Sequence, residues 1–101
     1  MHYIIHQGDI LKIEKITPFV LVVSKDFFNT TGEIIGCPIY EGGTEGPLHI
    51  KISTREIDGF VQCEKLALFD LSIRGFSKID RITMPDVINI TDAVQSIFDY
   101  I

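Results

Sequence analysis

From Gly8 to about Ile82, hydrophobic residues fall in short runs separated by turn-forming residues. This spacing is typical of β-strands rather than helices. The runs predict strands over residues 9–16, 19–24, 33–39, 49–53, 59–69 and 72–76. Residues 9–16 alternate imperfectly, which indicates an edge or curved strand. The unbroken apolar run over 19–24 indicates a central strand that is covered on both faces.

The segments between the strands carry turn chemistry. Residues 25–29 predict a short turn or helical hook, and residues 40–47, which hold three glycines, predict a loop. That loop is not a phosphate-binding loop, because no Gly-Lys-Ser/Thr or helix start follows it and its two glutamates would repel phosphate. Residues 77–82 predict a single helical turn.

The end of the chain has a different period. Val87, Ile90, Val94 and Ile97 recur at three- and four-residue steps, continued by Phe98 and Ile101. This is the pattern of an amphipathic helix, and Pro85 with Asp86 suits its first turn. We expect the apolar stripe to be chiefly core, and Ile88 and Tyr100 to belong to a dimer or partner surface. The predicted class is mostly β with one C-terminal helix.

Composition limits the chain to one small domain, residues 1–101. Its 101 residues are 46% hydrophobic and 23% charged, with 8 glycines and 4 prolines, which is typical of a compact soluble domain. The formal net charge of −5 disfavours strong nonspecific binding of polyanions. Any nucleic acid would therefore be held locally or through an oligomer.

The two cysteines, Cys37 and Cys63, form neither a CxxC motif nor a Cys/His cluster. We therefore expect no disulfide framework, no metal site and a reducing compartment. Cys63 is interpreted as a small buried hydrophobe, because no basic residue is placed to activate it. The first residues lack a basic start and a long apolar run, so we expect no signal peptide, no membrane span and a cytoplasmic location.

Several short motifs follow one another in a distinctive order. The chain has Q-G-D-I at residues 7–10, V-L-V-V-S and F-F-N within 20–29, C-P-I-Y-E-G-G at 37–43, and G-F-V-Q-C-E-K at 59–65. In this order they resemble the MazF/PemK/Kid toxins of bacterial type II toxin–antitoxin pairs, with this chain as a divergent member of the MazF/CcdB superfamily. The resemblance extends over residues 7–101.

The resemblance implies a small SH3-like curved barrel of the MazF/PemK/CcdB type, a homodimer with a groove between the chains, and growth inhibition. It implies an antitoxin partner with an acidic-hydrophobic tail, and contact with DNA only through the antitoxin complex. It also implies cleavage of single-stranded RNA without a metal or other cofactor. In that reaction the ribose 2′-hydroxyl attacks its own phosphate, so a base, an acid and a charge-neutralising group are needed.

By the same resemblance, the catalytic positions would be Glu64, Tyr40 and Gln62. Glu64 stands where Kid-like members carry aspartate and would act as acid or base; the alternative is a solvated strand carboxylate paired with Lys65 or Lys51. Tyr40 would contact a phosphate, stack on a base or cap the loop. Gln62 would contact RNA or be an ordinary outward strand residue.

The family's Arg-Pro pair is missing, since Ile16-Thr17-Pro18-Phe19 stands in its place. We therefore expect a degenerate active site with weak or absent catalysis. The glutamate side chain is also longer than aspartate, and positioning errors of about 1 Å can cost roughly a hundredfold in rate.

Other candidate groups are scattered along the chain. His2, His6 and His49 have no spacing that links them to one site. Four basic residues occur within one stretch and would form either a local positive surface or a dispersed, solvated one: Lys65, Arg74, Lys78 and Arg81.

A second function class is open. The ending I-F-D-Y-I at residues 97–101 is faintly similar to that of the sister family CcdB. That similarity implies a non-enzymatic toxin or regulator that poisons a protein target such as DNA gyrase. Asp99 stands where that family has a bulky tryptophan.

Overall fold

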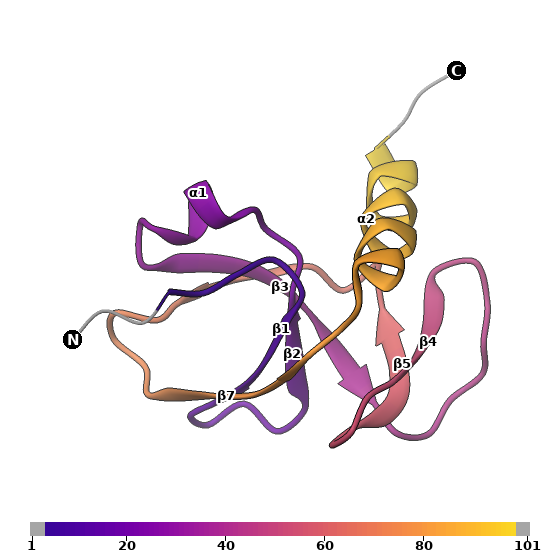
Figure 1. The fold of residues 1–101 in the computed structure, drawn as a ribbon, viewed down its shortest axis with the longest axis horizontal. Coiled ribbons are helices and arrows are strands. Elements are labelled where there is room, and N and C mark those ends of the chain that lie inside the picture. Colours follow the sequence, from indigo (N-terminus) through magenta and orange to yellow (C-terminus); the bar gives the residue numbers. More distant parts are fainter. Residues whose placement is uncertain (1–3, 99–101) are drawn as a thin grey trace.

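The computed structural model describes residues 4–98, in which a curved antiparallel sheet carries two helices (Figure 1). The strands are β1 (Asp9–Ile13), β2 (Phe19–Val22), β3 (Glu33–Tyr40), β4 (His49–Ser53), β5 (Asp58–Gln62), β6 (Ala67–Asp70) and β7 (Phe76–Arg81). The helices are α1 (Asp26–Asn29) and α2 (Met84–Phe98). The sheet order is β4-β5-β3-β2-β1-β7, and β6 also pairs with β3. The predicted class, mostly β with one C-terminal helix, is confirmed, and α1 is the predicted helical hook.

Strand β3 organises the sheet. One edge pairs with β2, while the other pairs with β6 at the start of β3 and with β5 at its end. Gly36 lies in the middle of β3, where an added Cβ would be 2.4 Å from Cγ1 of Val20 and 2.9 Å from the carbonyl oxygen of Leu21. Only glycine therefore allows β2 and β3 to approach this closely.

The apolar core lies on both faces of the sheet. Adjacent residues of a strand point to opposite faces of the sheet, so Ile10 and Leu11 enter different clusters. The register of β1 against β7 also shifts between these two residues. Ile10 packs with Leu21 and Val61 on the side covered by α2, and Leu11 packs with Val20 on the other side. The second strand is covered on both faces, as predicted. The first strand has the irregular register that suits a curved strand, but it is not an edge strand, because it pairs with both β2 and β7.

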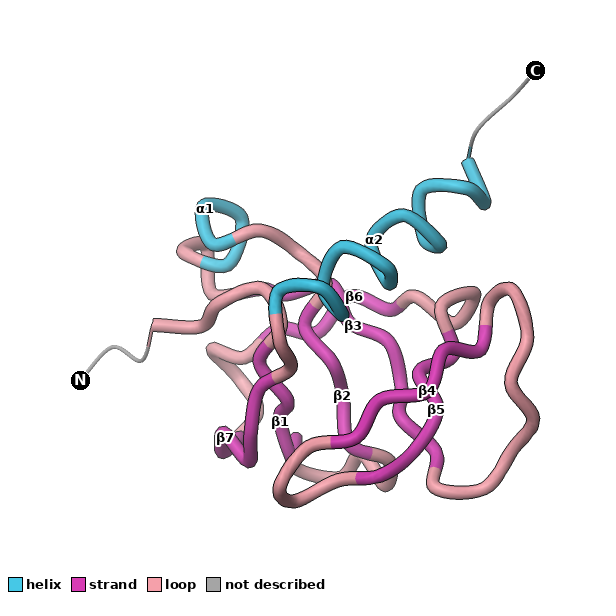
Figure 2. Tube along the Cα trace, turned by 45° about the vertical axis from the view of Figure 1, so that its right-hand side comes forward, coloured by secondary structure: helices cyan, strands magenta, loops and turns pink. Residues whose placement is uncertain are grey.

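Helix α2 packs against the core as far as Val94. Val87 and Ile90 are buried, and Val94 is partly buried against the same core. Further along, Ile97 is 40% exposed and Phe98 69% exposed, and the end of the helix projects away from the sheet in both views (Figure 1, Figure 2). The stripe is core at its start, as expected, but not at these two residues. Ile88 is exposed, as predicted, whereas Tyr100 and Ile101 lie outside the described residues.

Several predicted boundaries were also wrong. The first strand ends at Ile13 rather than Ile16, since Lys15 takes a left-handed backbone conformation with φ +66°. Residues 59–69 are not one strand, because a turn closed by the Lys65 N–H on the carbonyl of Gln62 separates β5 from β6. Residues 72–75 form a turn rather than a strand, with the Ser72 N–H bonded to Asp70 Oδ1.

The predicted helical turn over residues 77–82 is instead part of strand β7. Its backbone pairs with β1 along the edge of the sheet, and this long-range pairing overrides the local propensity. No ladder joins β7 to β4 at the other end of the sheet order. The two ends are linked by the Glu56 N–H, which donates to Asp80 Oδ2 at 3.1 Å. Within residues 4–98, no helix is long and apolar enough to cross a membrane.

Candidate functional site

Strands β3, β4 and β5 present one outward surface on which polar and aromatic side chains gather. Val61 and Ile52 alternate into the core, so their neighbours on β5 and β4 point the other way. Cross-strand pairing then sets side by side the residues of what we call the Tyr40–His49 face: Tyr40, His49, Lys51, Phe60 and Gln62. Gly59 brings the strands together here, because an added Cβ would lie 2.6 Å from the carbonyl oxygen of Tyr40.

The loop between β3 and β4 borders this face and is tied back to the sheet. The Cys63 N–H donates to the carbonyl of Leu48 at 2.8 Å, and Gly46 and His49 exchange backbone hydrogen bonds. These contacts hold the start of β4 beside the turn that follows β5. A depression of about 290 Å³ lies there, lined by residues 46–49 and Glu64.

Glu64 is bonded to a histidine across this depression. Its Oε2 lies 2.9 Å from Nε2 of His49, and both side chains are a little over one-third exposed. The hydrogen bond from His49, followed by one from a backbone N–H, lowers the pKa of the Glu64 carboxyl against a small opposing effect of burial, and the charges of His49 and Lys65 add to the lowering. The carboxylate is therefore ionised at neutral pH.

Two lysines lie over aromatic rings of the same face. Lys65 Nζ is 5.6 Å from the ring centroid of Tyr40, and Lys51 Nζ is 6.0 Å from that of Phe60. Cation–π contacts of this kind hold ammonium groups near the surface without neutralising them. The face thus combines positive charge with exposed ring surface, which suits a ligand that has phosphates and flat bases.

Gln62 lies opposite His49 in the β4–β5 register. Among the described residues, its Oε1 is the buried side-chain acceptor that has no hydrogen-bond partner. Such atoms are few in native proteins because an unmade buried hydrogen bond is costly. The structure therefore leaves an acceptor unpaired at the centre of the face.

The residues predicted for the site come from three segments and lie together. Tyr40 ends β3, Gln62 ends β5, and Glu64 lies in a turn rather than on a strand. Glu64 forms its hydrogen bond with His49. Of the lysines in the alternative pairing, Lys65 acts on Glu64 through its charge, whereas Lys51 pairs with Asp58. Sequence reasoning missed His49; pairing the runs 49–53 and 58–62 as a hairpin would have placed it opposite Gln62.

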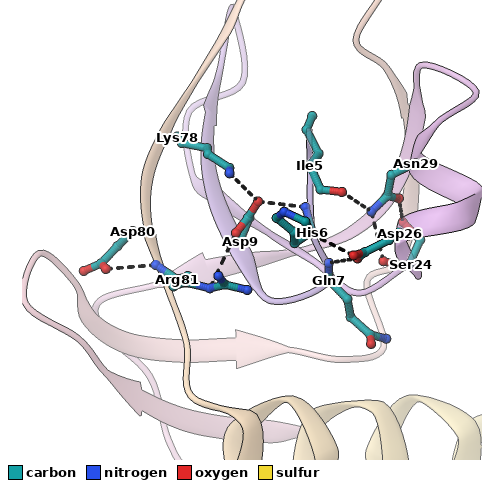
Figure 3. Close-up of polar contacts among 10 residues, drawn as sticks. All are labelled: Ile5, His6, Gln7, Asp9, Ser24, Asp26, Asn29, Lys78, Asp80 and Arg81. Carbon is teal, nitrogen blue, oxygen red and sulfur yellow. Dashed lines mark hydrogen bonds and ion pairs between the residues drawn. The ribbon is translucent and has the colours of Figure 1, made fainter. Parts of the chain in front are cut away.

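The second described histidine lies elsewhere. His6 Nδ1 is 2.7 Å from Asp26 Oδ2, and the Gln7 N–H donates to Asp26 Oδ1 (Figure 3). These bonds, led by that of His6, lower the pKa of the Asp26 carboxyl. Nearby, Asn29 Nδ2 donates to the carbonyl of Ile5 and so ties the N-terminal segment to α1. His6 and His49 therefore belong to different sites, as expected, and His2 lies outside the described residues.

The basic stretch does not form one surface. Lys78 Nζ lies 3.1 Å and Arg81 Nε 3.8 Å from the buried carboxylate of Asp9 (Figure 3). Arg74 donates to the carbonyl of Glu14, and Lys65 is on the Tyr40–His49 face. The interpretation as a dispersed set of charges is the correct one.

The cysteines, the possible metal ligands and the remaining depressions are the other features of the described residues that bear on the chemistry. Cys37 and Cys63 are buried free thiols, and burial raises the pKa of the first to about 12 and of the second to about 11. Cys63 is thus a core residue, as predicted. Residues 4–98 contain no group of three or more His, Cys, Asp or Glu side chains that could hold a metal ion. Depressions of about 480 and 400 Å³ lie beside α1 and share Asp26 and Phe27.

Comparison with known proteins identifies the fold and the family. Residues 8–98 match the family model described as PemK-like, MazF-like toxin of type II toxin–antitoxin system. The structure resembles MazF of a MazE–MazF complex from Deinococcus radiodurans, with a TM-score of 0.86, 16% identity, and coverage of 96% of this chain and 98% of the other. It also resembles an endoribonuclease in complex with its cognate antitoxin from a mycobacterial species, with a TM-score of 0.81, 13% identity, and coverage of 93% and 94%. No curated protein sequence matches the chain.

Proposed function

The chain belongs to the PemK-like, MazF-like toxin family of type II toxin–antitoxin systems, and from this we propose that it is a growth inhibitor that cleaves single-stranded RNA on the Tyr40–His49 face. The cleavage is attack of a ribose 2′-hydroxyl on the adjacent phosphate. It leaves a 2′,3′-cyclic phosphate on one product and a 5′-hydroxyl on the other.

One observation carries the proposal: Tyr40, Gln62 and Glu64 meet on one face with His49 and Lys65. The reaction needs a group that moves a proton and a cation near the phosphate. The Glu64–His49 pair meets the first need, and Lys65, next in the chain to Glu64, meets the second. The Tyr40 ring offers a surface on which a base can stack.

We also propose that this site lacks part of the family's usual catalytic machinery and is therefore degenerate. The arginine of the family's Arg-Pro pair is absent, and the chain's net charge of −5 weakens the general attraction for RNA. Catalysis is therefore expected to be weak, and its dependence on salt to reflect a few local contacts rather than a broad basic surface.

The test is incubation of the purified protein with a set of long structured and unstructured RNAs in the presence of EDTA. We expect discrete cuts in single-stranded regions, with cyclic phosphate and 5′-hydroxyl ends. Glu64→Gln should reduce the cleavage rate by at least tenfold. Glu45→Gln is the matched control, because Glu45 is an exposed glutamate of the bordering loop, and it should cleave at the parent rate.

The proposal fails if the parent protein cuts none of these RNAs. A Glu64→Gln rate equal to the parent rate would remove Glu64 from the reaction. Cuts that carry 3′-hydroxyl ends would show a different chemistry from 2′-hydroxyl attack.

The partners proposed are a second copy of the chain and an antitoxin, with DNA bound only through the antitoxin complex, in the cytoplasm. The projecting end of α2 supports a protein partner, because Ile97 and Phe98 are exposed there and apolar side chains gathered on a surface favour association. Size-exclusion chromatography with light scattering, alone and with the product of a neighbouring acidic reading frame, tests both. A chain that stays monomeric and binds no such product contradicts this part.

The alternative function is poisoning of a protein target such as DNA gyrase by the end of α2, without catalysis. The same exposed Ile97 and Phe98 favour it. The two functions separate in growth assays: deletion of Tyr100 and Ile101 should relieve growth arrest if a protein is the target. Glu64→Gln should relieve it if RNA is the target.

A further inference from the structure

The Glu64–His49 contact determines which ring nitrogen of the histidine can act as a base. An ionised carboxylate only accepts hydrogen bonds, so at 2.9 Å from Glu64 Oε2 the Nε2 of His49 carries the hydrogen. Among the described residues, none makes a hydrogen bond to Nδ1 of His49. In the neutral ring, Nδ1 is then a free proton acceptor on an imidazole that Glu64 holds in place.

In many enzymes a carboxylate orients a catalytic histidine: the ring transfers the proton, and the carboxylate fixes its tautomer. Glu64 and His49 have this arrangement. The backbone holds both residues: His49, at the start of β4, exchanges hydrogen bonds with Gly46 of the bordering loop, and the turn after Gln62 holds Glu64. Both groups line the same depression. Glu64 itself, ionised by its hydrogen bonds, is a weaker proton acceptor at neutral pH than an imidazole.

We propose that His49, rather than Glu64, is the acid–base residue of the RNA cleavage, and that Glu64 is a positioning residue for the ring; this rests on the proposed function. Nδ1 takes the proton from the 2′-hydroxyl as its oxygen bonds to phosphorus. The bond from phosphorus to the 5′-oxygen breaks, and the imidazolium returns the proton to that oxygen directly or through one water. No atom is gained or lost beyond the rearranged phosphodiester.

Other charged groups near the ring are few. Lys51 lies two residues along β4 and pairs with Asp58 at 3.8 Å. Lys65 lies over Tyr40, and Glu45 precedes Gly46 in the bordering loop. A reaction that uses the neutral ring as its base gains rate as the ring loses its proton.

The test compares single-turnover cleavage from pH 5 to 9 for the parent protein, His49→Gln, His49→Asn and Glu64→Gln. Both His49 variants should lose about a hundredfold or more in rate and should lose the rise with pH. Glu64→Gln should lose less, about tenfold to thirtyfold, and keep a rise. His6→Gln is the matched control, since His6 also pairs with a carboxylate but away from this face; its rate and pH profile should be those of the parent.

A readout independent of turnover is the ¹⁵N spectrum of the His49 ring. In the parent protein it should report the hydrogen on Nε2, and Glu64→Gln should allow a mixture of tautomers. Circular dichroism and a urea titration confirm that each variant is folded before its rate is used.

The outcomes separate the two proposals. A parent protein that cuts RNA while both His49 variants keep its rate or its pH profile overturns the role of His49 and leaves the proposed function standing. A Glu64→Gln rate far below that of His49→Gln returns the proton transfer to Glu64. A parent protein that cuts no RNA overturns both.

Discussion

Lys78 is the partner of a buried charge, which makes its removal a sensitive test of the structure. The carboxylate of Asp9 is 2% exposed; it forms ion pairs with Lys78 Nζ at 3.1 Å and Arg81 Nε at 3.8 Å, and it accepts a hydrogen bond from the His6 N–H at 2.8 Å. Lys78→Met keeps most of the length of the side chain and removes only its charge. It should destabilise the protein because the buried carboxylate loses its nearest cation.

The magnitude follows from distance and exposure. Unit charges 3.1 Å apart attract by about 5 kcal/mol at an effective dielectric constant of 20 and by about 1.3 kcal/mol in bulk water. The Lys78 side chain is 42% exposed, so its attraction to Asp9 lies between these two energies. Asp9 also keeps its bond from His6 and its contact with Arg81. We therefore expect the free energy of unfolding to fall by about 2 kcal/mol, and by less than about 1 kcal/mol for Arg81→Met, whose side chain is 61% exposed.

The assay is equilibrium unfolding in urea at one fixed protein concentration, so that any self-association affects all samples equally. With a slope of about 1–3 kcal/mol per molar urea, Lys78→Met should lower the midpoint by about 1 M. Lys12→Met is the control: Lys12 lies on β1, as Asp9 does, and its Nζ donates to the carbonyl of Ile16 at the surface, so its loss should change stability by about 0.5 kcal/mol or less.

Equal effects of Lys78→Met and Lys12→Met would refute the reasoning, since Asp9 would then not depend on Lys78. A larger loss for Arg81→Met than for Lys78→Met would show that the more distant, more exposed cation dominates.

Three further expectations follow from burial and from hydrogen bonding. Ile90→Ala should cost about 2–5 kcal/mol in urea unfolding because it leaves a cavity under α2, whereas the same change at exposed Leu68 should cost under about 1 kcal/mol; equal losses would contradict the packing of α2. Cys37 and Cys63, whose pKa values burial raises to about 12 and 11, should resist a thiol reagent at pH 8 until urea unfolds the protein; rapid labelling of the native protein would contradict this. The lowered pKa of Asp26 means that its stabilisation is present above about pH 4 and is lost as pH falls through the folded-state value. Between pH 5 and 2.5, the parent should thus lose more stability than Asp26→Asn. Equal losses would show that the hydrogen bond between His6 and Asp26 does not stabilise the folded protein.

Much of the fold could be predicted from local pattern. The apolar run at residues 19–24 and the stripe in residues 87–94 lie where the sequence places a central strand and a packed helix. Cys63 could be predicted as a core residue, since a thiol without a basic neighbour has nothing to activate it. In each case the information is in neighbouring residues of the chain.

Residues 77–82 show where local pattern fails. They have the composition of a helical turn, yet Phe76–Arg81 form a strand because β1 offers them a free edge. The segment 59–69 shows the reverse, because its continuous strand residues are broken at Glu64, where the chain passes from one end of β3 to the other. Neither outcome can be read from a window of the sequence.

The pattern of hydrophobic residues is enough to predict the fold class, most strands and the C-terminal helix, and the family resemblance adds Tyr40, Gln62 and Glu64 as a candidate set. The folded chain adds that His49 lies with them, that the apolar end of α2 is exposed, and that Lys78 and Arg81 pair with Asp9 rather than form a binding surface. The physical reason is that hydrophobic periodicity is a property of neighbouring residues. Strand register and charge pairing instead join residues far apart in the chain, and they exist only once the sheet has formed.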